Sequence, residues 1–243
     1  MSIERRTSMV GGLRRTGIRG GGGASLWTPS QLSLHVWYCD EWVDDGTNII
    51  TWTDKSGNGD DITQGTASLR ATIVSRYGTS VPQFDGADFY QGAFSSSASQ
   101  PFSVVATFEA TDTTVNTVCD SDDATNRMLI DLASTTTNCR GYAGASVTDG
   151  ATTVNTVHAV LFEANGASSS IAVDAWGSPT TGNAGAQEPD GITIGTNYTG
   201  GAAAGFAGYI PEIIVVNGLM TASEKASLPG YLNSAWSGLA VTT

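Results

Sequence analysis

Lysine is almost missing from this chain of 243 residues, since only Lys55 and Lys225 occur, and charged side chains make up just 14% of it. Coiled coils and long solvent-exposed helices need many charged residues, so both are disfavoured. No apolar run approaches the ~18 residues of a membrane span, and the basic start lacks the apolar stretch of a secretory signal. These absences predict a protein that is made in a cytoplasm, is not inserted into a membrane and is not exported by the general secretory route.

Cysteine is scarce too, and the three present form an odd set. Cys39, Cys119 and Cys139 lack the spacing of a metal site. Two interpretations stay open. A reducing compartment favours three buried thiols that behave as small apolar residues, and the other interpretation is a bridge between Cys119 and Cys139.

Glycine is abundant, with 30 residues, and it separates short runs in which apolar and polar residues alternate. Alternation with period two, interrupted by Gly, Asn, Asp and Ser clusters, predicts strands joined by turns. A length of 243 residues suits one all-β sandwich domain better than two small domains. The predicted strands are 34–38, 49–53, 81–84, 89–91, 102–109, 115–119, 127–132, 157–163, 171–175, 192–196 and 207–216.

Two of these strands show which faces they bury. In 102–109 the alternate residues Phe102, Val104, Ala106 and Phe108 are apolar, so that face should point into the core. The run 213–216 is apolar at every position, which is typical of a central strand that is covered on both faces.

One helix is predicted near the C-terminus. Thr221 is followed three residues later by Glu224, a capping box that satisfies two free N–H groups at a helix start. We expect Pro229 to break or restart this helix. The apolar spacing of Tyr231, Leu232 and Trp236 continues beyond it, so the segment should pack on the end of the sandwich.

The charge is divided unevenly along the chain. Residues 1–23 hold five Arg and one Glu, a net charge of +4, whereas residues 24–243 hold six basic and 22 acidic residues, a net charge of −16. This division predicts a flexible Arg/Gly-rich arm over 1–23 and a folded domain over 24–243. We expect the arm to dock on an acidic partner through its arginines, which are Arg5, Arg6, Arg14, Arg15 and Arg19.

Three segments, taken in order, carry a resemblance to a known family. They are residues 52–61 with Ser-Gly-Asn-Gly, residues 82–90 with Phe-Asp-Gly, and residues 192–195 followed by 206–216 with Gly-Tyr-Ile-Pro-Glu and an apolar run. Together they resemble the concanavalin A-like, laminin-G-like jelly-roll domains. The resemblance implies an antiparallel two-sheet jelly-roll sandwich with a short C-terminal helix. Such sandwiches serve as sugar-binding modules, as enzyme scaffolds and as parts of phage particles.

Catalytic motifs are missing from the sequence. Glycosidases of this architecture often carry Glu-x-Asp-x-x-Glu on one strand, and the seven Glu residues here are scattered singly. Glu212 is interpreted as a structural residue of the closing strand, and His35 and His158 as packing residues in strands. We therefore expect that the protein is not an enzyme.

Two sets of residues are candidates for binding. Exposed aromatic rings beside polar groups can stack on sugars, and the candidates are Trp42, Trp176, Asn197 and Tyr198. Each ring could equally cover the edge of the sandwich. A Ca²⁺ ion could be held by a second set, Asp120, Asp122, Asp123 and Asn126, for which a solvated loop is the alternative.

These observations predict a non-enzymatic structural protein of a phage particle, either a capsid decoration or cement protein or a head or tail fibre. The arm would dock on a capsid or tail protein, and the sandwich would be exposed on the virion. The alternative is a carbohydrate-binding adhesin that recognises host surface glycans. A nucleic-acid-binding coat protein ranks last, because five Arg are few for packaging a genome. Assembly into a homo-oligomer stays open.

Overall fold

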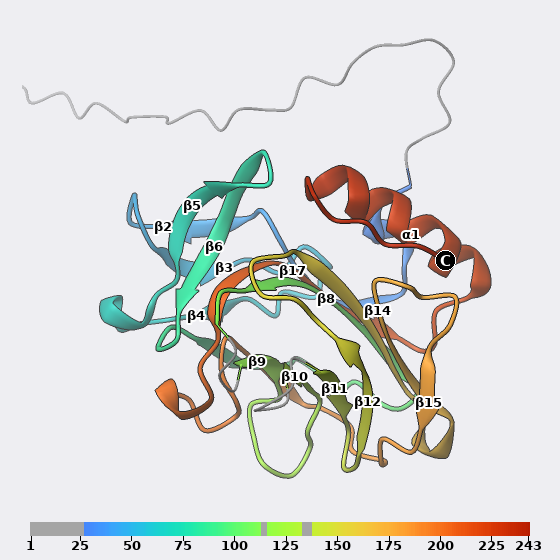
Figure 1. Ribbon diagram of the computed structural model, residues 1–243. Helices are drawn as coiled ribbons and strands as arrows, with labels where there is room; N and C mark the ends of the chain where they lie inside the picture. Colours follow the sequence, from blue (N-terminus) through green and yellow to red (C-terminus); the bar gives the residue numbers. More distant parts are fainter. Residues whose placement is uncertain (1–26, 113–115, 133–137) are drawn as a thin grey trace, which may run out of the picture.

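The structure is a computed structural model that describes residues 27–112, 116–132 and 138–243 (Figure 1). Over these ranges it confirms the predicted antiparallel all-β sandwich with one short C-terminal helix. Two large sheets lie face to face, and α1 lies on the outer side of one of them (Figure 1). The proposed docking arginines of the arm lie outside the described residues.

The larger sheet has eight strands in the order β15-β14-β13-β8-β17-β6-β5, and β1 pairs with β17 outside this path. All its pairings are antiparallel. Its strands are β1 (Leu34–Tyr38), β5 (Thr72–Arg76), β6 (Thr79–Asp85), β8 (Phe102–Ala110), β13 (His158–Ala164), β14 (Ser169–Val173), β15 (Thr180–Gly182) and β17 (Ala207–Asn217).

The second sheet has six strands in the order β12-β11-β10-β9-β16-β7, and a third, small sheet has the order β2-β3-β4. The strands of the second sheet are β7 (Tyr90–Ala93), β9 (Asn116–Asp120), β10 (Leu129–Leu132), β11 (Asn138–Tyr142), β12 (Ser146–Ala151) and β16 (Gly191–Ile194). Those of the third are β2 (Trp42–Asp44), β3 (Ile49–Trp52) and β4 (Ile62–Thr63). Every predicted strand corresponds to one of these, while β2, β4, β5, β11, β12 and β15 were not predicted.

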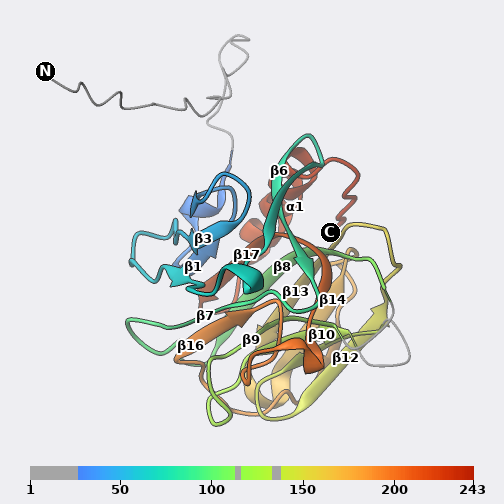
Figure 2. The ribbon, with the colours of Figure 1, turned by 90° about the vertical axis from the view of Figure 1, so that its left-hand side faces the viewer.

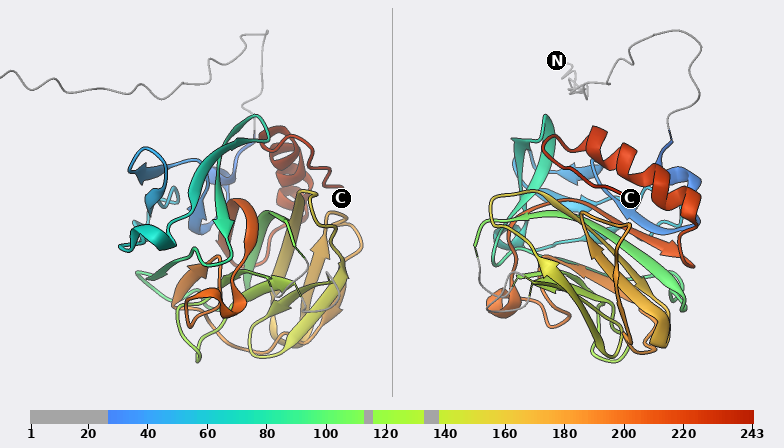
Figure 3. Two further views of the ribbon diagram at one scale, coloured as in Figure 1. Left: turned by 60° about the vertical axis from the view of Figure 1, so that its left-hand side comes forward. Right: turned by 45° about the vertical axis from the view of Figure 1, so that its right-hand side comes forward.

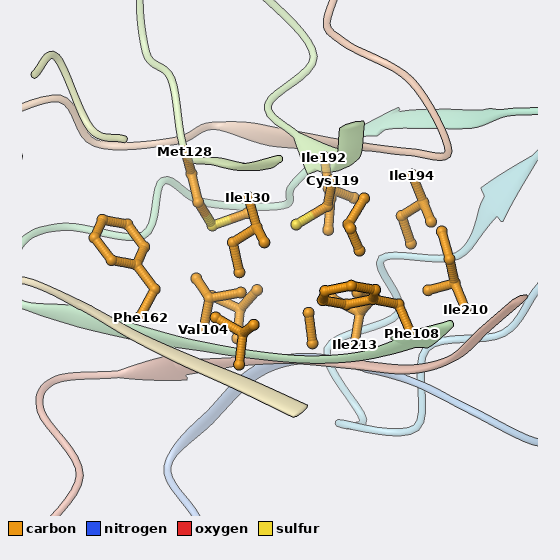
Figure 4. Packing of buried hydrophobic residues seen from close by; sticks show 14 of the residues in the cluster. Val104, Phe108, Cys119, Met128, Ile130, Phe162, Ile192, Ile194, Ile210 and Ile213 are labelled. Atoms are coloured by element: carbon orange, nitrogen blue, oxygen red, sulfur yellow. The ribbon is translucent and has the colours of Figure 1, made fainter. Parts of the chain in front are cut away.

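The main core fills the space between the two large sheets (Figure 4). Val104 and Phe108 of β8 and Ile213 of β17 face Ile130 and Ile192 of the second sheet (Figure 4). The predicted inward face of β8 is therefore confirmed. The three cysteines are buried and unbridged, as the first of the two interpretations predicted.

A second apolar cluster covers the outer face of the larger sheet. Val105 and Ile214, the alternate residues of β8 and β17, pack there with Leu228, Leu232 and Trp236 of the helical segment. This contact explains why residues 213–216 are apolar on both faces. It also corrects the expected position of the helix, which covers the face of a sheet and not the end of the sandwich.

Helix α1 spans Ala222–Ala235 and begins at the predicted capping box. Thr221 Oγ1 accepts a hydrogen bond from Glu224 N, and the Glu224 carboxylate accepts one from Thr221 N. The expected break at Pro229 does not occur, because the helix continues through it and buries Pro229 beside Leu228. Burial of this apolar surface compensates for the backbone hydrogen bond that proline cannot make.

Short 3₁₀ turns occupy Pro29–Gln31, Ala67–Leu69, Gly166–Ser168 and Ala202–Ala204. Within the described ranges, no helix has the length and apolar character needed to cross a membrane.

Candidate functional site

The β5–β6 hairpin stands beside α1 at one end of the molecule (Figures 2 and 3). Its strands are joined by Tyr77 and Gly78, whose φ angles of 52° and 83° form the left-handed two-residue turn that suits a twisted hairpin. Arg76 and Tyr77 both bind the carboxylate of Glu109, a residue of β8 that is only 2% exposed. The tip of the hairpin is therefore fixed to the sheet.

Two adjoining cavities flank this hairpin, and we call them together the hairpin groove. They share Asp40, Gly78 and Thr79. The inner cavity, about 270 Å³, lies between the hairpin and α1 and is also lined by Trp37, Cys39, Lys55, Tyr231, Ala235 and Trp236. The outer cavity, about 680 Å³, lies between the hairpin and β2 and is also lined by Glu41, Trp42, Ser75 and Ser80.

The outer cavity combines one aromatic ring with polar groups. Trp42 pairs with Trp52 across β2 and β3, and its half-buried side chain packs against the main core. Trp42 lines the cavity together with the acidic residues Asp40 and Glu41 and three residues that carry hydroxyl groups. An apolar ring face beside hydrogen-bonding groups is the arrangement that a sugar requires.

The inner cavity is walled by three aromatic residues that one carboxylate holds in place. Glu212 is fully buried on β17, and its oxygens accept hydrogen bonds from Trp37 Nε1 (2.7 Å), Trp236 Nε1 (2.8 Å) and Tyr231 Oη (2.9 Å). Burial raises the pKa of Glu212 to about 7, although the hydrogen bonds from the three aromatic side chains act to lower it. The expectation that Glu212 is a structural residue agrees with these contacts.

Lys55 and Asp40 form an ion pair at the junction of the two cavities. Lys55 Nζ lies 2.7 Å from Asp40 Oδ1 and 4.9 Å from the centre of the Trp37 ring. Burial acts to raise the pKa of Asp40, but hydrogen bonds from Lys55 and Cys39 outweigh it and hold the pKa below its ordinary value. Burial raises the pKa of the Cys39 thiol, which therefore stays protonated at neutral pH.

The four aromatic and amide candidates from the sequence fall in three different places. Trp42 lines the hairpin groove, as described. Trp176 is only 4% exposed, and its indole N–H donates to the carbonyl of Ala159 in the cluster under α1. It is part of the core, which corrects the expectation that it offers a ring to a sugar.

Asn197 and Tyr198 lie next to the acidic loop that follows β9. Tyr198 N donates to Asp120 Oδ2 (3.1 Å), and the Arg127 guanidinium pairs with Asp120 and lies 4.8 Å from the Tyr198 ring centre. The structure thus brings together two sets of candidates that are about 75 residues apart in the sequence. Asn197 serves the turn, since its Oδ1 accepts from Thr199 N and Oγ1.

Two carboxylates of the acidic loop, those of Asp120 and Asp123, are engaged within the protein, whereas Asp122 Oδ1 is buried without a hydrogen-bond partner. Burial raises the pKa of Asp120 despite the ion pair with Arg127, and Asp123 Oδ1 accepts from the backbone of Thr125 and Asn126. Asn126 Nδ2 donates to Asp190 Oδ2. Asp122 packs against Gly191 of β16. In residues 27–112, 116–132 and 138–243 no group of three His, Cys, Asp or Glu residues is arranged to hold a metal ion.

Several groove residues were not predicted from the sequence. Tyr231 and Trp236 were noted only as the apolar side of the helix, and Lys55 and Thr79 gave no signal. Their common position results from the hairpin, the helix and β1 meeting in space, which no local sequence pattern records.

Comparison with known proteins identifies the fold. No model of a known protein family matches the sequence, and no curated protein matches it. Among solved structures, Trypanosoma rangeli sialidase in complex with sialic acid is similar with a TM-score of 0.58 and 16% identity over 90% of this chain. The chain spans only 35% of that sialidase.

Two further solved structures come from proteins named as an arabinanase and an arabinofuranosidase. Domain 4 of AbnA, a GH43 extracellular arabinanase from Geobacillus stearothermophilus, is in complex with arabinotriose. It has a TM-score of 0.54 and 15% identity over 79% of this chain and 96% of that domain. A GH54 α-L-arabinofuranosidase has a TM-score of 0.60 and 15% identity, over 78% of this chain and 52% of the other. At these identities the likeness establishes the β-sandwich fold alone.

Two predictions are corrected by these neighbours. The expected non-enzymatic structural protein of a phage particle is wrong, because the neighbours are carbohydrate-active proteins and none of those named comes from a phage. The expectation that the protein is not an enzyme is wrong for the same reason. It depended on a missing motif on one strand, whereas a sandwich can bring carboxylates together from several strands.

Proposed function

We propose that this protein is a carbohydrate-binding β-sandwich and that its glycan lies in the hairpin groove. The observation that carries the proposal is the outer cavity, where the ring of Trp42 is flanked by Asp40, Glu41 and the hydroxyls of the hairpin. A volume of about 680 Å³ is within the range of small-molecule sites.

Similarity to solved structures supports this proposal. Domain 4 of the arabinanase, of which the chain covers 96%, is a domain of similar fold that was crystallised with arabinotriose. Membership of the concanavalin A-like, laminin-G-like sandwiches is part of the same proposal, since these sandwiches include sugar-binding modules.

The proposal is tested with a glycan array, followed by calorimetry on the glycans that bind. We expect Trp42→Ala to weaken binding about fivefold or more, because one stacked ring contributes on the order of 1 kcal/mol or more. Tyr198→Ala is the matched control, since it removes the other accessible aromatic candidate, which is half-buried beside the second sheet, and it should leave affinity unchanged.

Circular dichroism and the melting temperature establish that both variants are folded. Folded wild-type protein that binds no glycan on the array would refute the proposed function. Loss of binding in Tyr198→Ala and not in Trp42→Ala would refute the location and move the site to the second sheet.

A further inference from the structure

The charges that line the hairpin groove are unbalanced. Asp40 and Glu41 bring two carboxylates, and Lys55 is the only basic residue among those that line it. Lys55 is already paired with Asp40 at 2.7 Å, so that carboxylate offsets its charge. Glu41 is exposed and is left without a cationic partner among the groove residues.

The residues around the groove add further negative charge. The chain carries a net charge of −12, and Asp44 and Asp45 follow Trp42 at the end of β2. Arg70 is paired with Asp45, which leaves it engaged as well. A cleft in which one sign of charge predominates concentrates its field at the ligand, and the excess of carboxylates over Lys55 disfavours an anion here.

A carboxylate on the ligand would also lose water on entering the groove. Burial of an ionised group without a partner costs several kcal/mol, and the groove offers it no unpaired Lys or Arg among its lining residues. Neutral sugar hydroxyls have no such cost, because they can donate to Asp40 and Glu41 and exchange hydrogen bonds with Thr79 and Ser80.

The shape of the groove indicates the length of the ligand. The inner and outer cavities share Asp40, Gly78 and Thr79 in their linings, and each has its own aromatic wall, Trp42 in one and Tyr231 with its neighbours in the other. One sugar ring can fill only one of these cavities.

We infer that the hairpin groove selects uncharged oligosaccharides of at least two units and rejects glycans that bear carboxylates. This inference rests on the proposed function and adds the class of ligand to it. Sialic acid and uronic acids would be excluded, whereas neutral pentose and hexose chains would be accepted.

The test compares matched glycans by calorimetry. The probes are arabinotriose and the neutral trisaccharides that bind on the array, each beside its counterpart with primary hydroxyls oxidised to carboxylates, and beside its monosaccharide. We expect each neutral trisaccharide to bind at least tenfold more tightly than its oxidised counterpart and than its monosaccharide.

A double variant, Asp40→Asn with Glu41→Gln, tests whether the two carboxylates cause the preference for neutral glycans. It removes both carboxylates and frees Lys55, so the preference for the neutral member of each pair should fall at least tenfold, whatever happens to the absolute affinity. The matched control is Asp123→Asn, which removes a carboxylate in the loop after β9, away from the groove, and should leave the preference unchanged.

The outcomes separate the inference from the proposed function. If no glycan binds to the folded protein, the proposed function fails. If glycans bind and the oxidised trisaccharides bind as tightly as the neutral ones, or the monosaccharides as tightly as the trisaccharides, the function stands and the inference is overturned. An unchanged preference in the double variant would also overturn it.

Discussion

Trp37 Nε1 donates a 2.7 Å hydrogen bond to the carboxylate of Glu212, and both residues are buried beneath α1. Trp37 belongs to β1 and Glu212 to β17. The same carboxylate accepts hydrogen bonds from Tyr231, which lies in α1, and from Trp236, which directly follows it. One side chain therefore connects the larger sheet to the segment that walls the inner cavity.

We predict that Glu212→Ala lowers the free energy of unfolding by about 3 kcal/mol or more. It leaves two buried indole donors and the partly buried Tyr231 hydroxyl without an acceptor, each buried donor at a cost of about 1–3 kcal/mol, and it opens a cavity. Urea denaturation followed by tryptophan fluorescence measures the effect.

The control for this variant is Glu41→Ala, which removes an exposed carboxylate. Its free energy of unfolding should lie within about 0.5 kcal/mol of the wild type. Equal stability of Glu212→Ala and Glu41→Ala would show that the hydrogen bonds to Glu212 do not hold the helix.

The pH dependence of stability should also depend on Glu212. Its pKa is raised from 4.5 to about 7 in the folded protein, mainly by burial. A group whose pKa is higher in the folded state contributes stability that is complete below the unfolded pKa and is lost as pH rises through the folded pKa. The wild type should thus lose stability as the pH rises from about 4.5 to about 7, with a slope on the order of 1 kcal/mol per pH unit.

Glu212→Gln keeps the shape of the side chain and cannot ionise. The variant should therefore become more stable relative to the wild type as the pH rises across the same range. Denaturation curves at several pH values measure the difference in unfolding free energy. A difference that stays constant from about pH 4.5 to about pH 7.5 would contradict the assigned titration.

The features predicted from the sequence are those that neighbouring residues determine. The alternation of Val104 and Phe108 fixes which face of β8 is inward, and the cap formed by Thr221 and Glu224 fixes where α1 begins. Both patterns act within a few residues, so they can be recognised without knowledge of the tertiary contacts. Pro229 is the exception, because packing on the sheet outweighs its local preference.

The candidate site depends on contacts between distant parts of the chain. Trp37 and Glu212 are 175 residues apart, and no sequence pattern joins them. Trp42 and Trp176 look alike in the sequence, since each is a tryptophan with polar side chains within two positions of it. They differ only because the C-terminal segment covers Trp176, whose backbone N–H donates to Thr242 O, while Trp42 lines an open groove.

Two glycines provide the last prediction, because they have opposite surroundings. A Cβ atom at Gly205 would lie 1.8 Å from the carbonyl oxygen of Gly86, so Gly205→Ala forces two backbone segments apart beside β17. Gly230 is exposed inside α1, and a Cβ there meets nothing within 4 Å. We expect Gly205→Ala to destabilise the protein by about 1–3 kcal/mol through overpacking. We expect Gly230→Ala to stabilise it by about 0.5–1 kcal/mol, because alanine has less backbone freedom to lose.

Urea denaturation of the two variants side by side measures both effects. Similar stability of the two would mean that the close approach of Gly205 to Gly86 does not constrain the fold.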